Sequence, residues 1–260
     1  MTRVRTIAGT PGAVTGLMFL MTVFANDLSA NGYSGCSRQT HNGTAYTVCS
    51  VDPKKAQLQL FLADASGKAF RSYKRLEKDL NSRGECLVFG MNAGMYHKDM
   101  SPVGLYVENG EERAPVNTDD DTGNFFLKPN GIFFIKNGKA GVLETNAYKR
   151  RKRTPDLASQ SGPMLVIDGK IHPRFIVDSP YRKRRNGVGV TNDGRVIFAI
   201  SENKVNFRDF ALFFRDQLKS PNALYFDGKI SSLYDKEKRR SDRNGTLGPI
   251  IGITAKKCGG

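Results

Sequence analysis

Apolar residues along this chain come in short runs, which predicts a fold built mainly from strands. Leu58, Leu60 and Leu62 alternate with their neighbours, the period of two that is typical of a strand. Beyond residue 85 the apolar runs are short and frequent: 86–91, 103–107, 131–135, 140–143, 164–167, 188–191, 196–200, 223–226 and 250–254. We expect a strand at each of them.

Asn-Gly and Asp-Gly pairs separate several of these runs. Such pairs favour tight hairpins, because both central positions of the turn need positive φ. The pairs are Asn109-Gly110, Asn137-Gly138, Asp168-Gly169, Asp193-Gly194 and Asp227-Gly228. The strands are therefore predicted to be largely antiparallel.

Two segments have the period of a helix instead. The first ends near Gly84, and its apolar side consists of Phe70, Tyr73, Leu76 and Leu80. The second begins at Asn206, whose side chain can cap it, and ends before Pro221. Its apolar stripe is Phe207, Phe210, Phe214 and Leu218.

These elements predict an α+β fold, a single domain of mostly antiparallel or mixed strands with two to three helices after an N-terminal signal peptide. We divide the chain into a leader at 1–30, the N-terminal part of the domain at 31–85, a core at 86–254 and a tail at 255–260. Surface loops are expected at 115–124, 147–158 and 178–187.

The leader follows the pattern of a secretory signal peptide. Arg3 and Arg5 precede a segment without charge, 7–25, whose second half is densely apolar. The apolar part is short for a membrane span, so we expect cleavage and no stable span afterwards. An uncleaved anchor is the alternative. We therefore expect a periplasmic or secreted protein.

Four cysteines follow the leader, and an even count in an exported chain suggests two disulfides. Three pairings are open. We favour Cys36 with Cys49, which closes a small loop, and Cys86 with Cys258, which ties the tail to the core. No C-x-x-C is present, so neither a thiol redox site nor a thiolate zinc site is expected.

The chain is strongly basic, with 40 Lys and Arg against 25 acids and a net charge of +15. This excess favours anionic partners such as phosphates, acidic glycans, nucleic acid or a membrane surface. It is concentrated in three runs, 149–153, 182–185 and 236–240. Because an export signal precedes them and no aromatic residue interrupts the first two, we expect no nucleic acid partner.

Candidate chemistry lies first in the passage from Met91 to Asp99. Its small residues let backbone N–H groups approach a ligand, and His97 and Asp99 can act as acid, base or metal ligand. A purely structural loop is the alternative. Gln160 and Ser161 precede an apolar run and can line the mouth of a site, although a turn explains them equally well. On spacing alone, Asp227 cannot be separated from Asp168 as a turn residue.

An ordered set of motifs resembles the phosphodiester glycosidase domain family, which includes the lysosomal enzyme that uncovers mannose 6-phosphate. The resemblance covers about residues 86–253. The motifs are Asn92-Ala93-Gly94-Met95-Tyr96, Ser101-Pro102-Val103-Gly104-Leu105, Asn130-Gly131-Ile132-Phe133, Gln160-Ser161-Gly162-Pro163-Met164-Leu165, Arg185-Asn186-Gly187-Val188-Gly189-Val190, Asn222-Ala223-Leu224-Tyr225-Phe226-Asp227-Gly228 with Ser231, and Gly248-Pro249-Ile250. The lysosomal branch resembles Asn-Gly-Gly-Phe-Phe at the first motif, so the substrate preference is expected to differ.

The resemblance implies an exported hydrolase that cleaves the bond between a sugar and a phosphodiester. It implies catalytic residues at Asp227, Arg185 and Asn92. The residues expected to bind substrate are Gly94, Tyr96, His97, Gln160, Ser161, Gly162, Asn186 and Ser231. In this hypothesis Arg185 grips the phosphate through a bidentate contact, and Asp227 serves as nucleophile or as base for water.

The expected partner is a sugar phosphodiester or an anionic glycan. No cofactor is firmly implied, and a divalent cation stays an option, with His97 and Asp99 as its candidates. The alternative function is a non-catalytic envelope module that binds anionic polysaccharide through a basic face. A third is an envelope phosphodiesterase that cuts the P–O bond, which would need a metal site. The sequence leaves the oligomeric state open.

Overall fold

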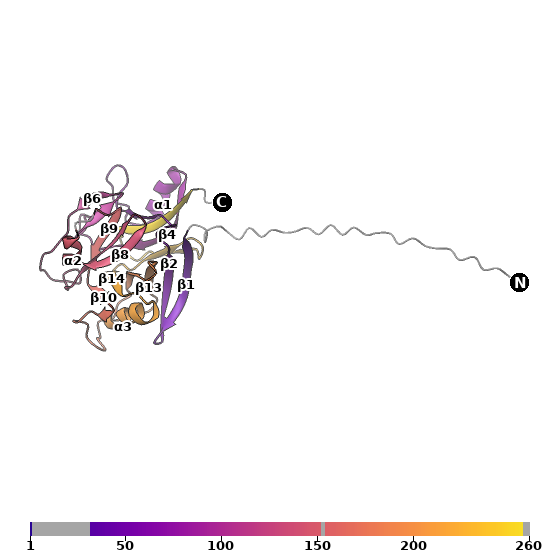
Figure 1. Ribbon diagram of the computed structural model, residues 1–260. Helices are drawn as coiled ribbons and strands as arrows, with labels where there is room; N and C mark the ends of the chain where they lie inside the picture. The colour runs from indigo at the N-terminus through magenta and orange to yellow at the C-terminus, as the bar shows by residue number, and fades with distance from the viewer. Residues whose placement is uncertain (2–31, 152–153, 257–260) are drawn as a thin grey trace.

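The structure is a computed structural model that describes residues 32–151 and 154–256, besides Met1. In these ranges the chain forms three antiparallel sheets with three α-helices. This confirms the predicted α+β fold of a single domain. Figure 1 shows how the labelled elements lie in the molecule. The predicted signal peptide and the Cys258 half of one predicted disulfide lie outside the described residues. None of the described helices is long and apolar enough to cross a membrane.

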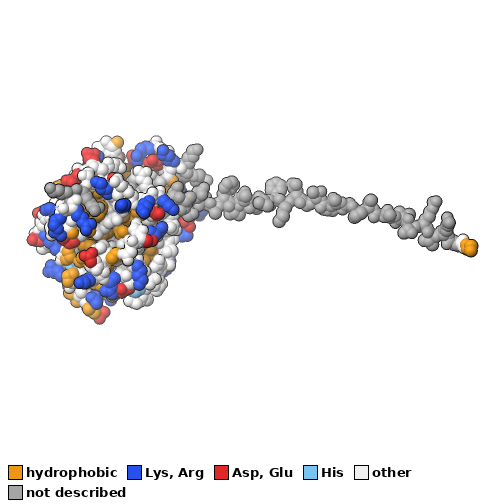
Figure 2. Space-filling view, in the orientation of Figure 1, with side chains coloured by type: hydrophobic (Ala, Val, Ile, Leu, Met, Phe, Trp, Pro, Cys, Tyr) orange, Lys and Arg blue, Asp and Glu red, His pale blue; other side chains and the backbone are white. Residues whose placement is uncertain are grey.

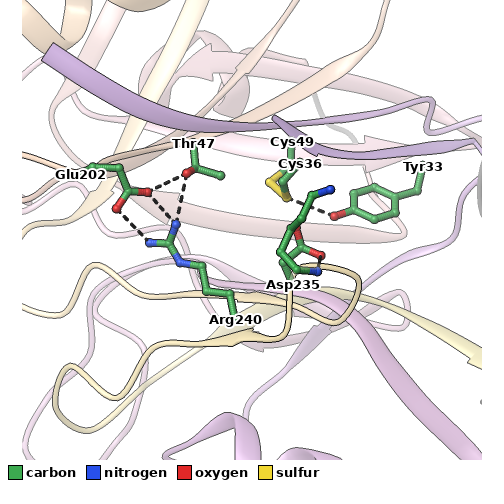
Figure 3. The surroundings of a disulfide bond; sticks show 8 residues. Tyr33, Cys36, Thr47, Cys49, Glu202, Asp235 and Arg240 are labelled. Carbon is green, nitrogen blue, oxygen red and sulfur yellow. Dashed lines mark hydrogen bonds and ion pairs between the residues drawn. A yellow bond between two sulfur atoms is a disulfide. The ribbon is translucent and has the colours of Figure 1, made fainter. Parts of the chain in front are cut away.

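The largest sheet has seven strands in the order β1-β2-β13-β12-β14-β10-β11. Its strands are β1 (Tyr33–His41), β2 (Thr44–Val51), β13 (Val196–Ser201), β12 (Asn186–Val190), β14 (Asn222–Asp227), β10 (Met164–Ile167) and β11 (Lys170–Ile171). Apolar residues in its centre, such as Val188, Phe198 and Leu224, are fully buried. The edge strand β1 is joined to β2 by a disulfide between Cys36 and Cys49, as predicted (Figure 3).

The other two sheets have five strands each, in the orders β16-β15-β4-β17-β3 and β6-β5-β9-β7-β8. The first contains β3 (Leu58–Phe61), β4 (Glu85–Asn92), β15 (Leu233–Asp235), β16 (Arg240–Ser241) and β17 (Ile250–Lys256). The second contains β5 (Tyr106–Glu108), β6 (Glu111–Ala114), β7 (Gly131–Lys136), β8 (Lys139–Glu144) and β9 (Leu157–Ser161). One large apolar cluster joins residues of all three sheets, among them Phe89, Phe133 and Phe198.

Both predicted helices are present. Helix α1 (Tyr73–Ser82) is capped by Ser72 and buries Leu76 and Leu80. Helix α3 (Phe207–Leu212) begins after Asn206, whose Oδ1 accepts the N–H of Asp209 at 2.8 Å. A π-helical turn, η2 (Phe213–Gln217), continues it and ends before Pro221.

The expected loop at 147–158 is wrong at both ends. Helix α2 (Thr145–Arg150) occupies its start, because Glu144 caps the free N–H of Ala147 at 2.8 Å. Strand β9 begins at Leu157 and lies in the centre of its sheet. The sequence did not indicate this strand, because several of its residues are polar rather than apolar. These polar side chains are buried, and hydrogen bonds within the protein satisfy them.

Four of the five Asn-Gly and Asp-Gly pairs join paired strands, as predicted. The fifth, Asp227-Gly228, does not form a hairpin. Strand β14 ends at Asp227, and the chain then crosses to β15 in a different sheet. This crossing opens the space in which the candidate site lies.

An ion-pair network ties the sheets together beside this crossing. Arg240 of β16 contacts Glu202 at 2.6 Å and Thr47 of β2 at 3.1 Å, as drawn in Figure 3. Arg240 also binds Asp242 at 3.1 Å. Since all of these groups are partly buried, the network holds the end of β13 against β16.

Candidate active site

A cleft of about 1010 Å³ lies where β14 leaves the largest sheet. The start of β12, the loop after β4 and the loop before β17 surround it. Its fifteen lining residues are Met95, Tyr96, Asn124, Lys183, Arg184, Lys204, Tyr225, Asp227, Gly228, Lys229, Ile230, Ser231, Asn244, Gly245 and Thr246. Segments far apart in the sequence thus meet at one concave surface.

Asp227 is the only acid among these described lining residues. Its Oδ1 accepts the backbone N–H of Lys229 at 2.7 Å, which fixes the carboxylate at the end of β14. Burial raises the pKa of Asp227 above its ordinary value, although backbone N–H groups and Lys229 oppose the rise. Because it is only partly buried, this carboxylate can reach a ligand in the cleft.

Four cationic side chains line the same cleft: Lys183, Arg184, Lys204 and Lys229. Arg184 is held in place, with Nε bonded to the carbonyl of Ser201 at 3.1 Å and Nη2 paired with Glu202 at 3.2 Å. One carboxylate among four cations leaves an excess of positive charge, which favours an anionic ligand.

Tyr96 forms part of the opposite wall. Its hydroxyl donates to the carbonyl of Thr246, and its ring lies against Gly248, where a Cβ would come within 2.1 Å of the ring. Burial, reinforced by the charge of Asp227, raises the pKa of Tyr96 to about 12, so the phenol stays neutral near pH 7. Gly94 precedes it with a φ of +145°, and a Cβ there would meet Ser159 Oγ at 2.8 Å.

Two buried asparagines form the floor behind the cleft. Asn186 Nδ2 donates to the carbonyl of Asn92 at 2.9 Å, and Asn92 Nδ2 lies 3.3 Å from Asn186 Oδ1. Asn92 Oδ1 accepts the N–H of Ser232 at 2.8 Å. These bonds join β4, β12 and the segment after Asp227. Neither asparagine lines the cleft.

Ser231 links this floor to the cleft. Its hydroxyl lies 2.6 Å from the carbonyl of Asp227 and 3.1 Å from that of Arg184. It therefore fixes the backbone that carries both charged residues. The structure brings together Asp227, Tyr96 and Ser231 as lining residues, with Asn92 and Asn186 directly behind Ser231.

Gln160 lies away from the cleft and is 2% exposed. Its Oε1 accepts the N–H groups of Leu105 at 3.0 Å and Asn117 at 2.9 Å, and its Nε2 donates to Asn117 O at 2.6 Å and Thr145 Oγ1 at 3.2 Å. All of these partners belong to the protein. The side chain anchors the loop that begins near residue 115.

Ser161 and Gly162 also lie within the protein. Ser161 is fully buried and donates to the carbonyl of Phe226 at 3.0 Å, one residue before Asp227. Gly162 packs so closely that a Cβ would lie 2.4 Å from the carbonyl of Phe125. Ser161 therefore supports the end of β14 from behind, and Gly162 allows the segment at Phe125 to approach closely.

Arg185 lines a second, smaller cavity of about 350 Å³ next to the cleft. Its Nε donates to the carbonyl of Val205 at 2.9 Å and its Nη2 to that of Tyr181 at 3.1 Å. The guanidinium carbon lies 3.6 Å from the ring centre of Phe207. The remaining nitrogen, Nη1, is buried without a hydrogen-bond partner. The two cavities share Asn124 and Lys183.

His97 and Asp99 are exposed in the turn after β4 and line neither cavity. Asp99 Oδ1 accepts Ser101 N at 3.0 Å and Ser101 Oγ at 2.6 Å, and these bonds lower the pKa of its carboxyl. Within 32–151 and 154–256, no three His, Cys, Asp or Glu side chains are grouped so that they could hold a metal ion.

Several lining residues were not predicted. Lys183 and Arg184 belong to a basic run noted in the sequence, and Tyr225 and Lys229 flank Asp227, so local signals existed for them. Asn124, Lys204 and Asn244 carry no sequence signal, because only the pairing of distant strands brings them to the cleft.

The cleft thus combines one partly buried carboxylate with four cationic side chains, at the point where two sheets separate. Residues 85–253 match the phosphodiester glycosidase family, so the chain belongs to this family. The chain is 37% identical to a protein of Escherichia coli strain K12 described as uncharacterized protein YigE, over 74% of each chain.

Two solved structures share the fold. One is the catalytic domain of zebrafish N-acetylglucosamine-1-phosphodiester alpha-N-acetylglucosaminidase, auto-inhibited by its pro-peptide; the TM-score is 0.58 at 14% identity, covering 84% of this chain and 81% of that one. The other is a hypothetical protein from Synechocystis, with a TM-score of 0.57 at 12% identity, covering 86% of this chain and 62% of that one.

Proposed function

We propose that this chain hydrolyses the bond between a sugar and a phosphodiester, with Asp227 as the acting carboxylate. The observation that carries the proposal is the cleft itself, where Asp227 is the one acid among the fifteen described lining residues and four of these are cations. Membership of the phosphodiester glycosidase family supports the reaction class. The zebrafish enzyme's name supports a sugar phosphodiester as the substrate class.

The leaving group explains why one carboxylate is enough. When the bond between the anomeric carbon and the phosphate oxygen breaks, the electron pair stays on that oxygen, and a phosphate monoester leaves as a stable anion. Protonation by a second carboxyl is therefore less necessary than in an ordinary glycoside, where two carboxyl groups work together. Lys183, Lys204 and Lys229 are placed to stabilise the charge on the departing phosphate.

Asp227 then acts at the anomeric carbon in one of two ways. As a base it removes a proton from the attacking water, whose oxygen bonds to the sugar; as a nucleophile it forms a glycosyl ester that water then hydrolyses. In the first case the anomeric configuration inverts, and in the second it is retained. The configuration of the released sugar, followed by NMR, assigns the role.

Arg185 and the buried polar residues receive supporting roles in this proposal. Arg185 is held by the carbonyls of Val205 and Tyr181 and gives its positive charge to the lining of the smaller cavity, which favours a phosphate that extends toward this cavity. Asn92, Asn186 and Ser161 keep the end of β14 and the segment after it in position, and Gln160 anchors the loop near residue 115; in this proposal none of the four touches the sugar. Tyr96 offers a ring to the sugar face.

The experiment is hydrolysis of a panel of sugar phosphodiesters by the purified chain in oxygen-labelled water. The proposal predicts that the label enters the sugar, because the C–O bond breaks, and that turnover persists in the presence of a chelator. Label in the phosphate would show P–O scission and contradict it. Salt-sensitive binding of the whole panel without turnover would favour a module that binds anionic polysaccharide, which the cationic lining also fits.

We also place the protein outside the cytoplasm. The disulfide between Cys36 and Cys49 supports this, because such bonds persist mainly in oxidising compartments. The signal-peptide pattern of residues 1–30 adds independent support from the sequence. Fractionation of cells that express the full chain tests the location.

A further inference from the structure

Three exposed apolar side chains gather in one short segment beside the site. Apart from Met1, the described residues with large exposed hydrophobic side chains are Ile176, Val177 and Tyr181, at 68%, 60% and 79% exposure. All three belong to residues 174–181, which we call the tip segment. A lone exposed apolar residue needs no explanation, but a cluster of them marks an interaction surface.

A continuous ring stack anchors the tip segment to the fold. His172 stacks on Phe175 with ring centroids 4.6 Å apart, Phe175 stacks on Phe207 of α3 at 5.1 Å, and the guanidinium carbon of Arg185 lies 3.6 Å from the centroid of the Phe207 ring. His172 is buried, and this burial lowers its pKa to about 4. The imidazole at this end of the stack is therefore uncharged near pH 7. The exposed side chains are therefore displayed from a fixed base.

Positive charge surrounds the tip segment. The smaller cavity beneath it is lined by four cations, Arg174, Lys183, Arg185 and Arg208, and by no acid among its described lining residues. The sequence of residues 174–185 contains five cationic residues and a single acidic one, Asp178. Arg182 is paired with Asp209 at 3.3 Å, while no ion pair of the described residues involves Arg174, Lys183 or Arg208. Figure 2 shows hydrophobic and basic side chains close together at the end of the molecule that carries α3.

We propose that the tip segment docks the protein on an anionic lipid surface, and that the substrate is a sugar phosphodiester whose other arm is a lipid. Apolar side chains that enter the interface, surrounded by Lys and Arg, are the features that bind proteins to anionic lipids. The smaller cavity continues from the cleft through the shared Asn124 and Lys183. It leads from the phosphate position toward the tip segment and takes the part of the lipid next to the phosphate.

The lining of the smaller cavity fits a lipid as this second arm. Phe175 and Phe207 are engaged in the ring stack with His172 and Arg185. The remaining lining includes Leu127, Ile176 and the exposed Tyr181, besides the cations. Aliphatic side chains and a tyrosine next to cations are typical of a membrane interface, so they fit an acyl or isoprenoid chain that follows a phosphate.

The test compares two variants with the same change in charge, Val177→Asp in the tip segment and Ala65→Asp in the exposed turn between β3 and α1. Helix α1 lies at the opposite end of the molecule from α3 (Figure 1). Vesicles of phosphatidylcholine, with and without phosphatidylglycerol, are sedimented with the full-length mature chain. We expect wild type to bind the anionic vesicles, Val177→Asp to lose at least about tenfold in binding, and Ala65→Asp to bind like wild type. Equal melting temperatures show that both variants fold.

The substrate class rests on the proposed function, so it is tested separately. A vesicle-embedded glycosyl phospholipid should be hydrolysed at least about tenfold more slowly by Val177→Asp, while a short soluble sugar phosphodiester is hydrolysed as by wild type. Turnover of the soluble substrate without vesicle binding would overturn the docking and leave the proposed function intact. Vesicle binding through the tip segment without hydrolysis of either substrate would support the docking and overturn the proposed function. Equal losses in the two variants, or binding only to a protein partner, would also overturn the docking.

Discussion

The chain contains two Asp-Gly pairs at strand ends that local sequence does not distinguish, and their surroundings differ completely. Asp168-Gly169 joins β10 to β11 as a tight hairpin, with φ of 47° and 78° at its two residues. Asp168 is exposed, and its backbone N–H and carboxylate bond with Asn222. Asp227-Gly228 has no positive φ and forms no hairpin.

Sheet position explains the difference. Strand β11 is the edge of its sheet, so the turn beside it faces solvent on its open side. Strand β14 lies between β12 and β10, and the chain leaves it for another sheet. The carboxylate of Asp227 therefore lies where two sheets separate, partly buried and beside cations. The surroundings of each carboxylate therefore follow from where its strand ends rather than from the dipeptide that ends it.

The largest expected effect is on turnover. Asp227→Asn keeps the acceptor for Lys229 N–H but removes the base or nucleophile, so kcat should fall about a hundredfold or more. Asp168→Asn is the matched control at the hairpin and should change kcat less than about twofold, because its turn lies outside the cleft. Steady-state kinetics on a cleavable sugar phosphodiester measure both. Similar values of kcat in the two variants would show that Asp227 contributes no more to turnover than Asp168 does.

Substrate binding should show a smaller difference. The double change Lys204→Gln and Lys229→Gln removes two cations from the cleft, and KM should rise about tenfold because charge-assisted contacts to phosphate are lost. Lys170→Gln, beside the Asp168 hairpin, removes an exposed cation and should leave KM unchanged. The effect of the double change should shrink for a phosphate-free glycoside. An equal loss on both substrates would mean that these lysines do not bind phosphate.

The smallest expected effect is on stability and pH dependence. Since the pKa of Asp227 is raised in the folded protein, its ionisation costs stability above that pKa, and this cost fades as the pH falls toward the ordinary value of 3.8. Thermal melting at neutral pH should therefore give Asp227→Asn a Tm equal to or above that of wild type. The acidic limb of kcat/KM should also lie above pH 3.8, because the active form is ionised. A clearly lower Tm would indicate a structural carboxylate.

Local patterns predicted much of the fold, because periodicity and turn chemistry act over a few residues. The strand at Leu58, the cap at Asn206 and the bond between Cys36 and Cys49 were confirmed on that basis. Strand β9 was missed, because its polar residues are buried for reasons that lie in other strands.

The candidate site was less accessible to sequence reasoning. Asp227 was selected by resemblance, and only the register of β14 with β12 and β10 shows why it differs from Asp168. Lys204 joins the cleft through the extension of β13, which no local signal reveals. Gln160 resembled a residue at a site mouth, whereas its amide bonds lie within the protein.

The most direct test is a crystal structure of the Asp227→Asn variant with an intact sugar phosphodiester. The account predicts that the phosphate lies among Lys183, Lys204 and Lys229, with the anomeric carbon next to the substituted side chain at position 227. A sugar phosphodiester bound elsewhere, or bound in the cleft with its anomeric carbon remote from position 227, would contradict it.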